Sequence, residues 1–172
     1  MSETISENLR DFQARLADKL KAAESTGGTH SKLGFLAGGQ NWMVDLDQVN
    51  EVVTVPELTV APWVRPWFVG VASVRGVIYG CVDLAAFAGM ADPLPRGESR
   101  LLLVHPRFGV NAALRVERAL GLRPQQELTQ EPHTDGYPAW VVARWRDAAG
   151  ETWTEISVED LVQTPDFLNA GL

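Results

Sequence analysis

The sequence predicts an all-β protein with short helices, preceded by one amphipathic helix near the N-terminus. From Lys32 onward, short runs rich in β-branched residues alternate with clusters of Gly, Pro and Asn, a pattern typical of strands joined by tight turns. Helical patterns after that point are short, and no heptad array or fixed-period repeat is present. Many short strands with few helices favour barrels or a sandwich.

Length and composition limit the possible classes of protein. A chain of 172 residues suits one domain, or two small barrels sharing a core, because domains most often have about 100–150 residues. With 45% hydrophobic and 22% charged residues, the chain can bury a core. The net charge of −7 argues against nucleic-acid binding. No apolar stretch reaches the roughly 20 residues that a membrane-spanning helix needs, so no membrane insertion is expected.

Cysteine content and the N-terminal sequence predict a cytoplasmic location. The single cysteine, Cys81, excludes an intrachain disulfide and suits a reducing compartment. The start of the chain, MSETISENLRDF, lacks the charged and then apolar pattern of a secretory signal.

Residues 1–30 are expected to form a helix and a linker. Thr4 and Glu7 have the spacing of a capping box, and Gly27-Gly28 ends the pattern. The helix packs either on its own domain or on a partner. Its apolar residues recur at steps of three or four and so share one face: Ile5, Leu9, Phe12, Leu16, Leu20 and Ala23.

The first β series is expected between Lys32 and Gly89. Gly38-Gly39-Gln40-Asn41 has the composition of a hairpin turn, and Gly76 marks a second turn. Asp83 is placed to cap a short helix that Gly89 closes. The predicted strands are 33–37, 42–46, 49–55, 69–74 and 77–82, and the predicted helix is 84–88.

The second β series follows a polar linker over residues 92–99. Alternating apolar residues predict a half-buried strand over 110–116, and the polar run 125–138 is expected to be a surface loop. Ser157 and Asp160 form a second capping box. The domain is thus predicted to cover 32–172, with approximate halves 32–91 and 99–172. Either each half forms one barrel or the strands of the two barrels interleave along the chain. The other predicted strands are 100–104, 140–146 and 152–156.

No group of residues suggests catalysis, a metal site or a cofactor site. The three histidines, His30, His105 and His133, lie far apart without metal-ligand spacing. Cys81 lies in an apolar strand, where a free cysteine is usually buried and inert. Phosphate-loop and nucleophile-elbow motifs are absent from the sequence. We therefore expect a protein that is not an enzyme.

Five of the six tryptophans fall into two groups. Trp140, Trp145 and Trp153 fall in the C-terminal hairpin, where large rings usually build the core of a small barrel. Trp63 and Trp67 lie in the proline-rich passage APWVRPWFVG, where amphipathic rings often mark an interface. For these two residues, a core role and an interface role both remain open.

The central stretch resembles the CheW-like chemotaxis adaptor family. Residues 50–89 read NEVVTVPELTVAPWVRPWFVGVASVRGVIYGCVDLAAFAG. This run has the family's glutamate after the second strand, an extended proline-bearing passage, a turn similar to V-G-[VI]-x-N-[LV]-R-G, and a D-[LF] helix start. The resemblance covers roughly Lys32 to Val162. The segment PWFVGVASVRGVIYG and the predicted N-terminal helix are most similar to the branch that serves type IV pilus chemosensory systems (PilI-like).

The resemblance implies two packed, five-stranded SH3-like β-barrels and a non-catalytic role. Such adaptors join the signalling domain of methyl-accepting chemoreceptors to the regulatory domain of a CheA-type histidine kinase. The implied function is therefore an adaptor in a chemosensory array that controls type IV pilus (twitching) motility. The alternative from another class is a small-ligand or carbohydrate-binding β protein that uses Trp63 and Trp67.

The partner-binding residues are carried over by position. Arg75 matches the family's arginine, Glu51 its strand-end glutamate and Gly70 the glycine that opens the motif, while Ser73 stands where asparagine is usual. Arginine has five donors in a fixed fork, which suits carboxylates or backbone carbonyls of a partner. Within the chain, Arg75 has two candidate partners, Glu51 and Asp83, and an internal pair does not exclude partner binding. The neighbouring Val71 and Val74 are expected to supply an apolar floor.

Overall fold

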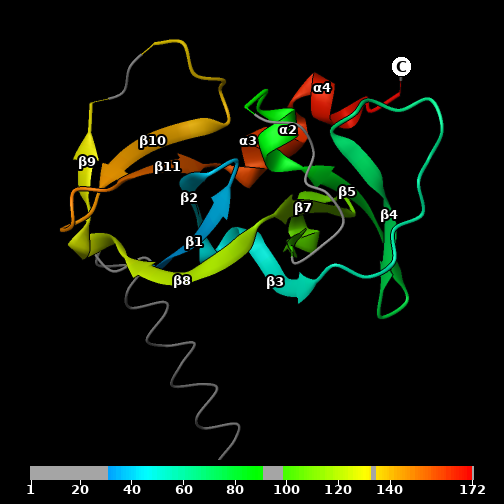
Figure 1. Ribbon diagram of the computed structural model, residues 1–172, viewed down its shortest axis with the longest axis horizontal. Coiled ribbons are helices and arrows are strands. Elements are labelled where there is room, and N and C mark those ends of the chain that lie inside the picture. Colours follow the sequence, from blue (N-terminus) through cyan, green and yellow to red (C-terminus); the bar gives the residue numbers. More distant parts are fainter. Residues whose placement is uncertain (1–30, 91–98, 133–134, 172) are drawn as a thin grey trace, which may run out of the picture.

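The computed structural model describes residues 31–90, 99–132 and 135–171. The expected N-terminal helix lies outside the described residues, as does most of the predicted linker. The described chain is mostly β and forms two sheets, of six and five strands, with short helices near the junction between them (Figure 1).

The six-stranded sheet combines the first strands of the chain with the last ones. Its neighbours are antiparallel, except that β11 runs parallel to β2. Its order is β8 (Arg118–Pro124), β1 (Ser31–Ala37), β2 (Gln40–Asp45), β11 (Thr152–Ile156), β10 (Val141–Arg146) and β9 (Thr129–Glu131).

The five-stranded sheet comes from the middle of the chain. Its neighbours are antiparallel, except that β7 runs parallel to β5. The approximate halves 32–91 and 99–172 each contribute strands to both sheets, so the strands interleave along the chain. The order is β3 (Val49–Thr54), β6 (Arg100–Val104), β7 (Ala112–Val116), β5 (Val77–Asp83) and β4 (Phe68–Val74).

Short helices lie at the ends of the strands. Two of them begin at the caps that the sequence predicts: Asp83 accepts a hydrogen bond from the Ala86 amide, and Ser157 from the Asp160 amide. The helices are η1 (Leu46–Gln48), α2 (Leu84–Phe87), η2 (Pro106–Phe108), η3 (Gln125–Glu127), α3 (Val158–Gln163) and α4 (Pro165–Leu168).

The largest core cluster lies between the two sheets. It contains Phe35 and Val44 from the first sheet and Leu102 and Leu114 from the second, all of them almost completely buried. Because both sheets contribute to one apolar core, they are stabilised together. Smaller clusters fill each sheet separately. Trp140, Trp145 and Trp153 are 4%, 7% and 1% exposed, which confirms their predicted core role.

Two expectations about strands were wrong. The strand predicted over 110–116 begins at Ala112 and is buried at every position, because it lies between β6 and β5 with side chains covered on both faces. The predicted loop 125–138 includes β9, which adds a sixth strand to its sheet. The sequence reading also missed β8, an edge strand with little alternation and with Gly121 at a φ of 87°.

Two ionic groups are buried beside the core. Arg115 donates two hydrogen bonds to Asp83, at 3.1 and 3.0 Å. Lys32 donates to Asp45 at 2.7 Å and to Glu155 at 3.0 Å, and Glu155 also accepts from the indole N–H of Trp145 at 2.7 Å. Buried charges need such partners, because removing one leaves the other without compensation in a low-dielectric interior.

Candidate partner-binding surface

The β4–β5 hairpin turns through Arg75 and Gly76. Val74 and Val77 are paired across the turn, and φ is 49° at Arg75 and 82° at Gly76. Two positive φ values at the central residues define a two-residue turn of the kind that matches strand twist. The glycine takes up this conformation without strain, whereas the arginine does so at a cost of about 1–2 kcal/mol. The turn therefore fixes where the Arg75 side chain leaves the sheet.

Arg75 forms an ion pair with Glu51 of β3. Strands β3 and β4 are the two edges of the five-stranded sheet, so the pair links its opposite ends. The side chains are 67% and 39% exposed, and exposed ion pairs contribute only about 0–1 kcal/mol to stability. The other candidate partner, Asp83, instead forms the buried pair with Arg115. The guanidinium of Arg75 thus remains accessible while its position is restrained.

The other candidate residues lie along β4. Ser73 is exposed and lies opposite Ile78 of β5, and Val71 and Val74 are half-buried. Val74 packs against the cluster inside the second sheet, so only part of it is available as an apolar floor. A shallow depression of about 360 Å³ is lined by Pro56, Glu57, Thr59, Val71, Ala72, Ser73 and Ile78.

Two exposed apolar residues of the hairpin were missed by sequence reasoning. Val77 and Ile78 are 40% and 64% exposed. Both residues are exposed because they lie at the turn end of β5, and burial increases along the strand toward Asp83. Their position next to the predicted turn at Gly76 is the signal that could have located them. We call Ser73, Arg75, Val77 and Ile78 the hairpin surface. It combines a restrained positive charge with apolar area.

Gly70 is buried and supports the hairpin from below. Its φ is 137°, and a Cβ atom at this position would come within 2.6 Å of the Thr59 carbonyl oxygen. This close approach allows Thr59 and Val71 to exchange two backbone hydrogen bonds of 2.9 Å. Gly70 thus holds the 55–60 segment against β4, and any contribution to partner binding is indirect.

Replacing Gly70 with alanine is therefore expected to destabilise the protein by about 2–3 kcal/mol, because the substitution adds a steric clash to an unfavourable φ. Urea denaturation followed by circular dichroism measures this loss. Gly76→Ala is the matched control, because Gly76 also has a positive φ but no atom within 4 Å of the added Cβ. That variant should lose only about 1 kcal/mol. Equal losses in the two variants would contradict the close approach at Thr59.

Among the described residues, Cys81 and His105 have structural surroundings. Burial raises the pKa of the Cys81 thiol to about 11, against a smaller opposing effect of the Arg115 charge, so the thiol stays protonated at neutral pH. His105 accepts a hydrogen bond from the Arg107 amide and caps η2. Within residues 31–90, 99–132 and 135–171, no three His, Cys, Asp or Glu side chains are grouped so as to hold a metal ion.

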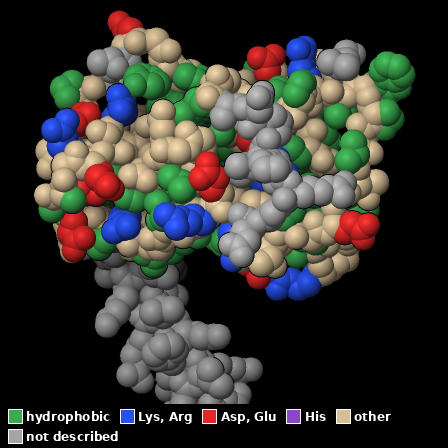
Figure 2. Space-filling model, in the orientation of Figure 1, with side chains coloured by type: hydrophobic (Ala, Val, Ile, Leu, Met, Phe, Trp, Pro, Cys, Tyr) green, Lys and Arg blue, Asp and Glu red, His purple; other side chains and the backbone are tan. Residues whose placement is uncertain are grey.

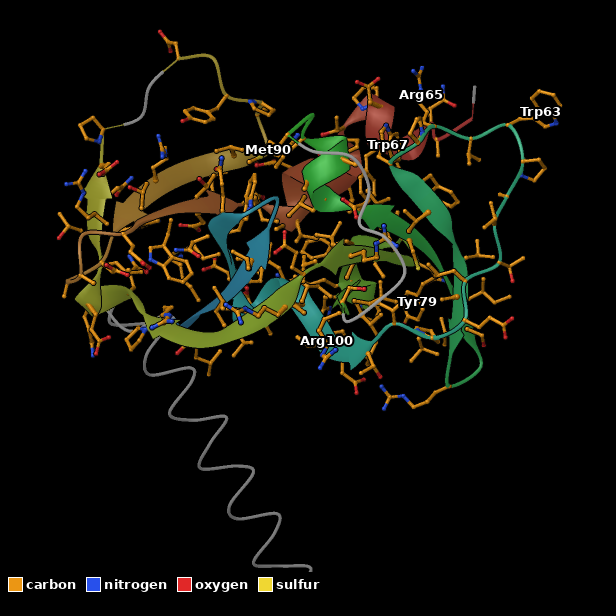
Figure 3. The ribbon with its side chains drawn as sticks, viewed as in Figure 1. Trp63, Arg65, Trp67, Tyr79, Met90 and Arg100 are labelled. Carbon is orange, nitrogen blue, oxygen red and sulfur yellow. The ribbon has the colours of Figure 1, made fainter. Side chains whose placement is uncertain are left out.

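The two interface-candidate tryptophans have different surroundings. Trp67 is half-buried and packs edge-to-face on Phe87, with ring centroids 4.9 Å apart. Trp63 is 82% exposed and points away from Trp67 (Figure 3). The two indoles therefore do not form a joint platform for a sugar or metabolite, and the ligand-binding alternative is not supported.

The described part of the chain contains no helix that is both long and apolar enough to cross a membrane.

The two β-sheets and the Arg75-Gly76 turn agree with the CheW-like resemblance of the sequence. Residues 32–166 match the CheW-like domain family, and the chain belongs to that family. The chain is 34% identical over 109 residues to Protein PilI of Pseudomonas aeruginosa. The aligned residues cover 63% of this chain and 61% of PilI. It thus spans less than two thirds of the length of that relative.

A solved structure confirms the fold independently. The scaffolding protein TtCheW from Thermoanaerobacter tengcongensis matches with a TM-score of 0.66 at 20% sequence identity. The match covers 80% of this chain and 94% of TtCheW. The predicted all-β fold of the CheW-like kind is therefore confirmed, with six strands in one sheet and five in the other.

Proposed function

We propose that the chain is a non-catalytic, cytoplasmic adaptor that couples chemoreceptors to a CheA-type histidine kinase in an array controlling type IV pilus motility. Membership of the CheW-like family and similarity to PilI support this function. The partners are the signalling domain of a methyl-accepting chemoreceptor and the regulatory domain of the kinase.

The observation that carries the proposal is the exposed Arg75–Glu51 pair on a rigid turn. A stability role alone does not explain it, because a pair this exposed contributes little to folding. Restraint by Glu51 reduces the side-chain entropy that Arg75 would lose on binding, and this reduction favours affinity.

The residues have different parts in this contact. Arg75, Glu51 and Ser73 supply the charged and polar groups, and arginine can bind a carboxylate through two parallel hydrogen bonds. Gly70, Val71 and Val74 hold the strand that presents them. The exposed Val77 and Ile78 add apolar area beside the charge, a combination that is common at the centre of interfaces.

Arg75→Glu is expected to weaken partner binding by about 2–5 kcal/mol, because the partner group that faces residue 75 is then either repelled by a like charge or left without its donor. The free energy of unfolding should change by less than about 0.5–1 kcal/mol, because the Arg75–Glu51 pair is exposed. Titration with a purified receptor signalling-domain fragment, together with a thermal melt, measures both quantities. Wild-type binding in the micromolar range, about −8 kcal/mol, is expected.

The charge-reversed double variant Arg75→Glu, Glu51→Arg is the control. The double variant restores an ion pair between positions 75 and 51, but residue 75 then has the wrong charge for the facing group of the partner. If the internal pair mainly positions Arg75, partner binding by the double variant therefore stays weak. Full binding by folded Arg75→Glu protein would exclude Arg75 from the interface. A large loss of stability in Arg75→Glu would indicate a structural role for the residue instead.

A further inference from the structure

The two sheets repeat one arrangement of strands. In the five-stranded sheet the hairpin β4–β5 has β7 parallel to its second strand, and α2 follows β5. In the six-stranded sheet the hairpin β10–β11 has β2 parallel to its second strand, and α3 follows β11. Both hairpins have a register shift after their first pair, between Phe68 and Gly70 and between Val141 and Ala143. The two hairpins therefore correspond strand by strand.

The loops that lead into the two hairpins also correspond. In each loop, two turn residues directly precede the first strand of the hairpin. The Phe68 amide donates a hydrogen bond of 3.0 Å across this turn to the Arg65 carbonyl. The Val141 amide donates one of the same length, 3.0 Å, to the Pro138 carbonyl. Arg65 thus occupies the position of Pro138.

The same correspondence pairs two tryptophans. The Trp67 carbonyl accepts a hydrogen bond of 2.8 Å from the Asp83 amide, and the Trp140 carbonyl accepts one of 2.8 Å from the Ser157 amide. With Phe87, the two tryptophans line a groove of about 610 Å³, which we call the aromatic groove. The Phe87 ring centroid is 4.9 Å from Trp67 and 5.9 Å from Trp140. Both tryptophans also pack on the core between the sheets, so they serve the fold.

Trp63 stands where the other loop has a glycine. It lies two residues before Arg65, and Gly136 lies two residues before Pro138. Both residues have a positive φ, 59° at Trp63 and 106° at Gly136. The two loops thus have a positive φ at the same position. Glycine takes up this conformation without strain, whereas a bulky residue does so only at a cost.

The strain at Trp63 gains no burial within the described chain. Trp63 is 82% exposed and projects at the upper right of the molecule (Figure 3). Figure 2 has the same orientation and shows hydrophobic side chains at this corner. Val60 is 66% exposed, and Arg65 is exposed as well. Backbone strain of this kind is concentrated at functional sites, and tryptophan is among the residues that most often anchor an interface.

The loop is fixed on both sides of Trp63. Thr59 is bridged to Val71 of β4, and Val64 is bridged to Gly171 near the end of the chain. An anchor that is already held in place loses little conformational freedom on binding, which favours affinity. We call Val60, Trp63 and Arg65 the loop surface.

The loop surface and the hairpin surface belong to opposite ends of β4. Trp63 and Arg65 precede Phe68, the first residue of the strand, whereas Arg75 directly follows Val74, the last. At about 3.3 Å per residue, the seven residues of β4 place these ends roughly 20 Å apart. The chain therefore has two separate surfaces that combine apolar area with an arginine.

We propose that the loop surface binds the regulatory domain of the CheA-type kinase, while the hairpin surface binds the receptor. This inference rests on the proposed adaptor function, which requires a second partner surface. Trp63 supplies an apolar ring with one N–H donor, and Arg65 supplies a fork of donors. The kinase surface that fits them has an apolar pocket with carbonyl or carboxylate acceptors at its rim.

Trp63→Ala is expected to weaken binding of the kinase regulatory domain by about thirtyfold, the size of a hot-spot loss of about 2 kcal/mol. Its affinity for the receptor signalling-domain fragment should equal that of the wild type. Isothermal titration of the full chain with each partner measures both. Leu122→Ala is the matched control, because Leu122 is 53% exposed but lies on β8 of the other sheet. It should leave the affinity for the kinase domain unchanged.

Trp63→Gly separates binding from stability. Because glycine tolerates a positive φ, as at Gly136, this variant should melt at or above the temperature of the wild type and above that of Trp63→Ala. Its affinity for the kinase domain should fall as in Trp63→Ala. A melting temperature clearly below that of the wild type would show that the ring stabilises the fold, and would overturn the inference.

The titrations also distinguish this inference from the adaptor function. If the wild type binds both partners and Trp63→Ala binds the kinase domain equally well, the loop surface is excluded and the adaptor function stands. If Trp63→Ala loses the receptor fragment and retains the kinase domain, the assignment of partners is wrong. A wild-type chain that binds neither partner would overturn the adaptor function, and this inference with it.

Discussion

Asp83→Ala is expected to lower the free energy of unfolding by about 3–5 kcal/mol, the loss typical of breaking a buried ion pair. Asp83 is completely buried and has two roles. One carboxylate oxygen accepts two hydrogen bonds from Arg115, and the other accepts a hydrogen bond from the Ala86 amide at the start of α2. The substitution therefore removes the charge that compensates a buried guanidinium and also removes a helix cap. Urea denaturation measures the loss.

Two controls separate these roles. Asp83→Asn keeps a cap acceptor and removes the charge, so it should lose most of the same free energy. Ser157→Ala removes only a cap, that of α3, and should lose about 1 kcal/mol. If Asp83→Ala lost no more than Ser157→Ala, the Asp83–Arg115 pair would not contribute as described.

Lys32→Met is expected to destabilise the protein by a similar amount, about 3–5 kcal/mol. Lys32 is 5% exposed and Glu155 7% exposed, so Glu155 would remain charged in a buried site with the Trp145 indole as its described hydrogen-bond donor. The double variant Lys32→Met, Glu155→Gln should recover part of the loss, because no buried charge then remains at this site. A double variant less stable than Lys32→Met would contradict this explanation.

The pH dependence of stability offers a second measurement on Lys32. Burial lowers the pKa of Lys32, but the hydrogen bonds and charges of Asp45 and Glu155 outweigh this effect and raise the pKa above its usual value of 10.5. A raised pKa in the folded state stabilises the protein fully below pH 10.5, and the contribution is lost as the pH rises through the folded-state value. The stability difference between wild type and Lys32→Met should therefore narrow above pH 10.5.

Local chemistry made much of the fold predictable from sequence. Gly38-Gly39 and Arg75-Gly76 form the expected turns, and Asp83 and Ser157 form the expected caps, because each signal acts over a few residues. Strand β7 was misjudged because its burial on both faces depends on neighbours that are distant in sequence. Strand β8 shows little alternation of apolar and polar residues, and it becomes a strand by pairing with β1, which is distant in sequence.

The candidate sites show the same limit. Arg75 could be located from its turn, and its pairing with Glu51 was one of two options that only the sheet order decides. The aromatic groove could not be predicted, because it brings together residues near positions 65, 87, 139 and 163. Trp63 and Trp67 have similar sequence contexts, and only the packing of Phe87 distinguishes the exposed ring from the half-buried one.

The central claim is that this chain joins two partners at once. A receptor signalling-domain fragment displayed on vesicles, mixed with the regulatory domain of the cognate kinase, tests it directly by co-sedimentation. The kinase domain should sediment with the vesicles when this chain is present and should stay largely in solution without it. Retention should fall with Arg75→Glu, because a binding loss of about 2 kcal/mol or more lowers the affinity about thirtyfold or more. A kinase domain that stays in solution at saturating concentrations of the folded chain would contradict the adaptor role.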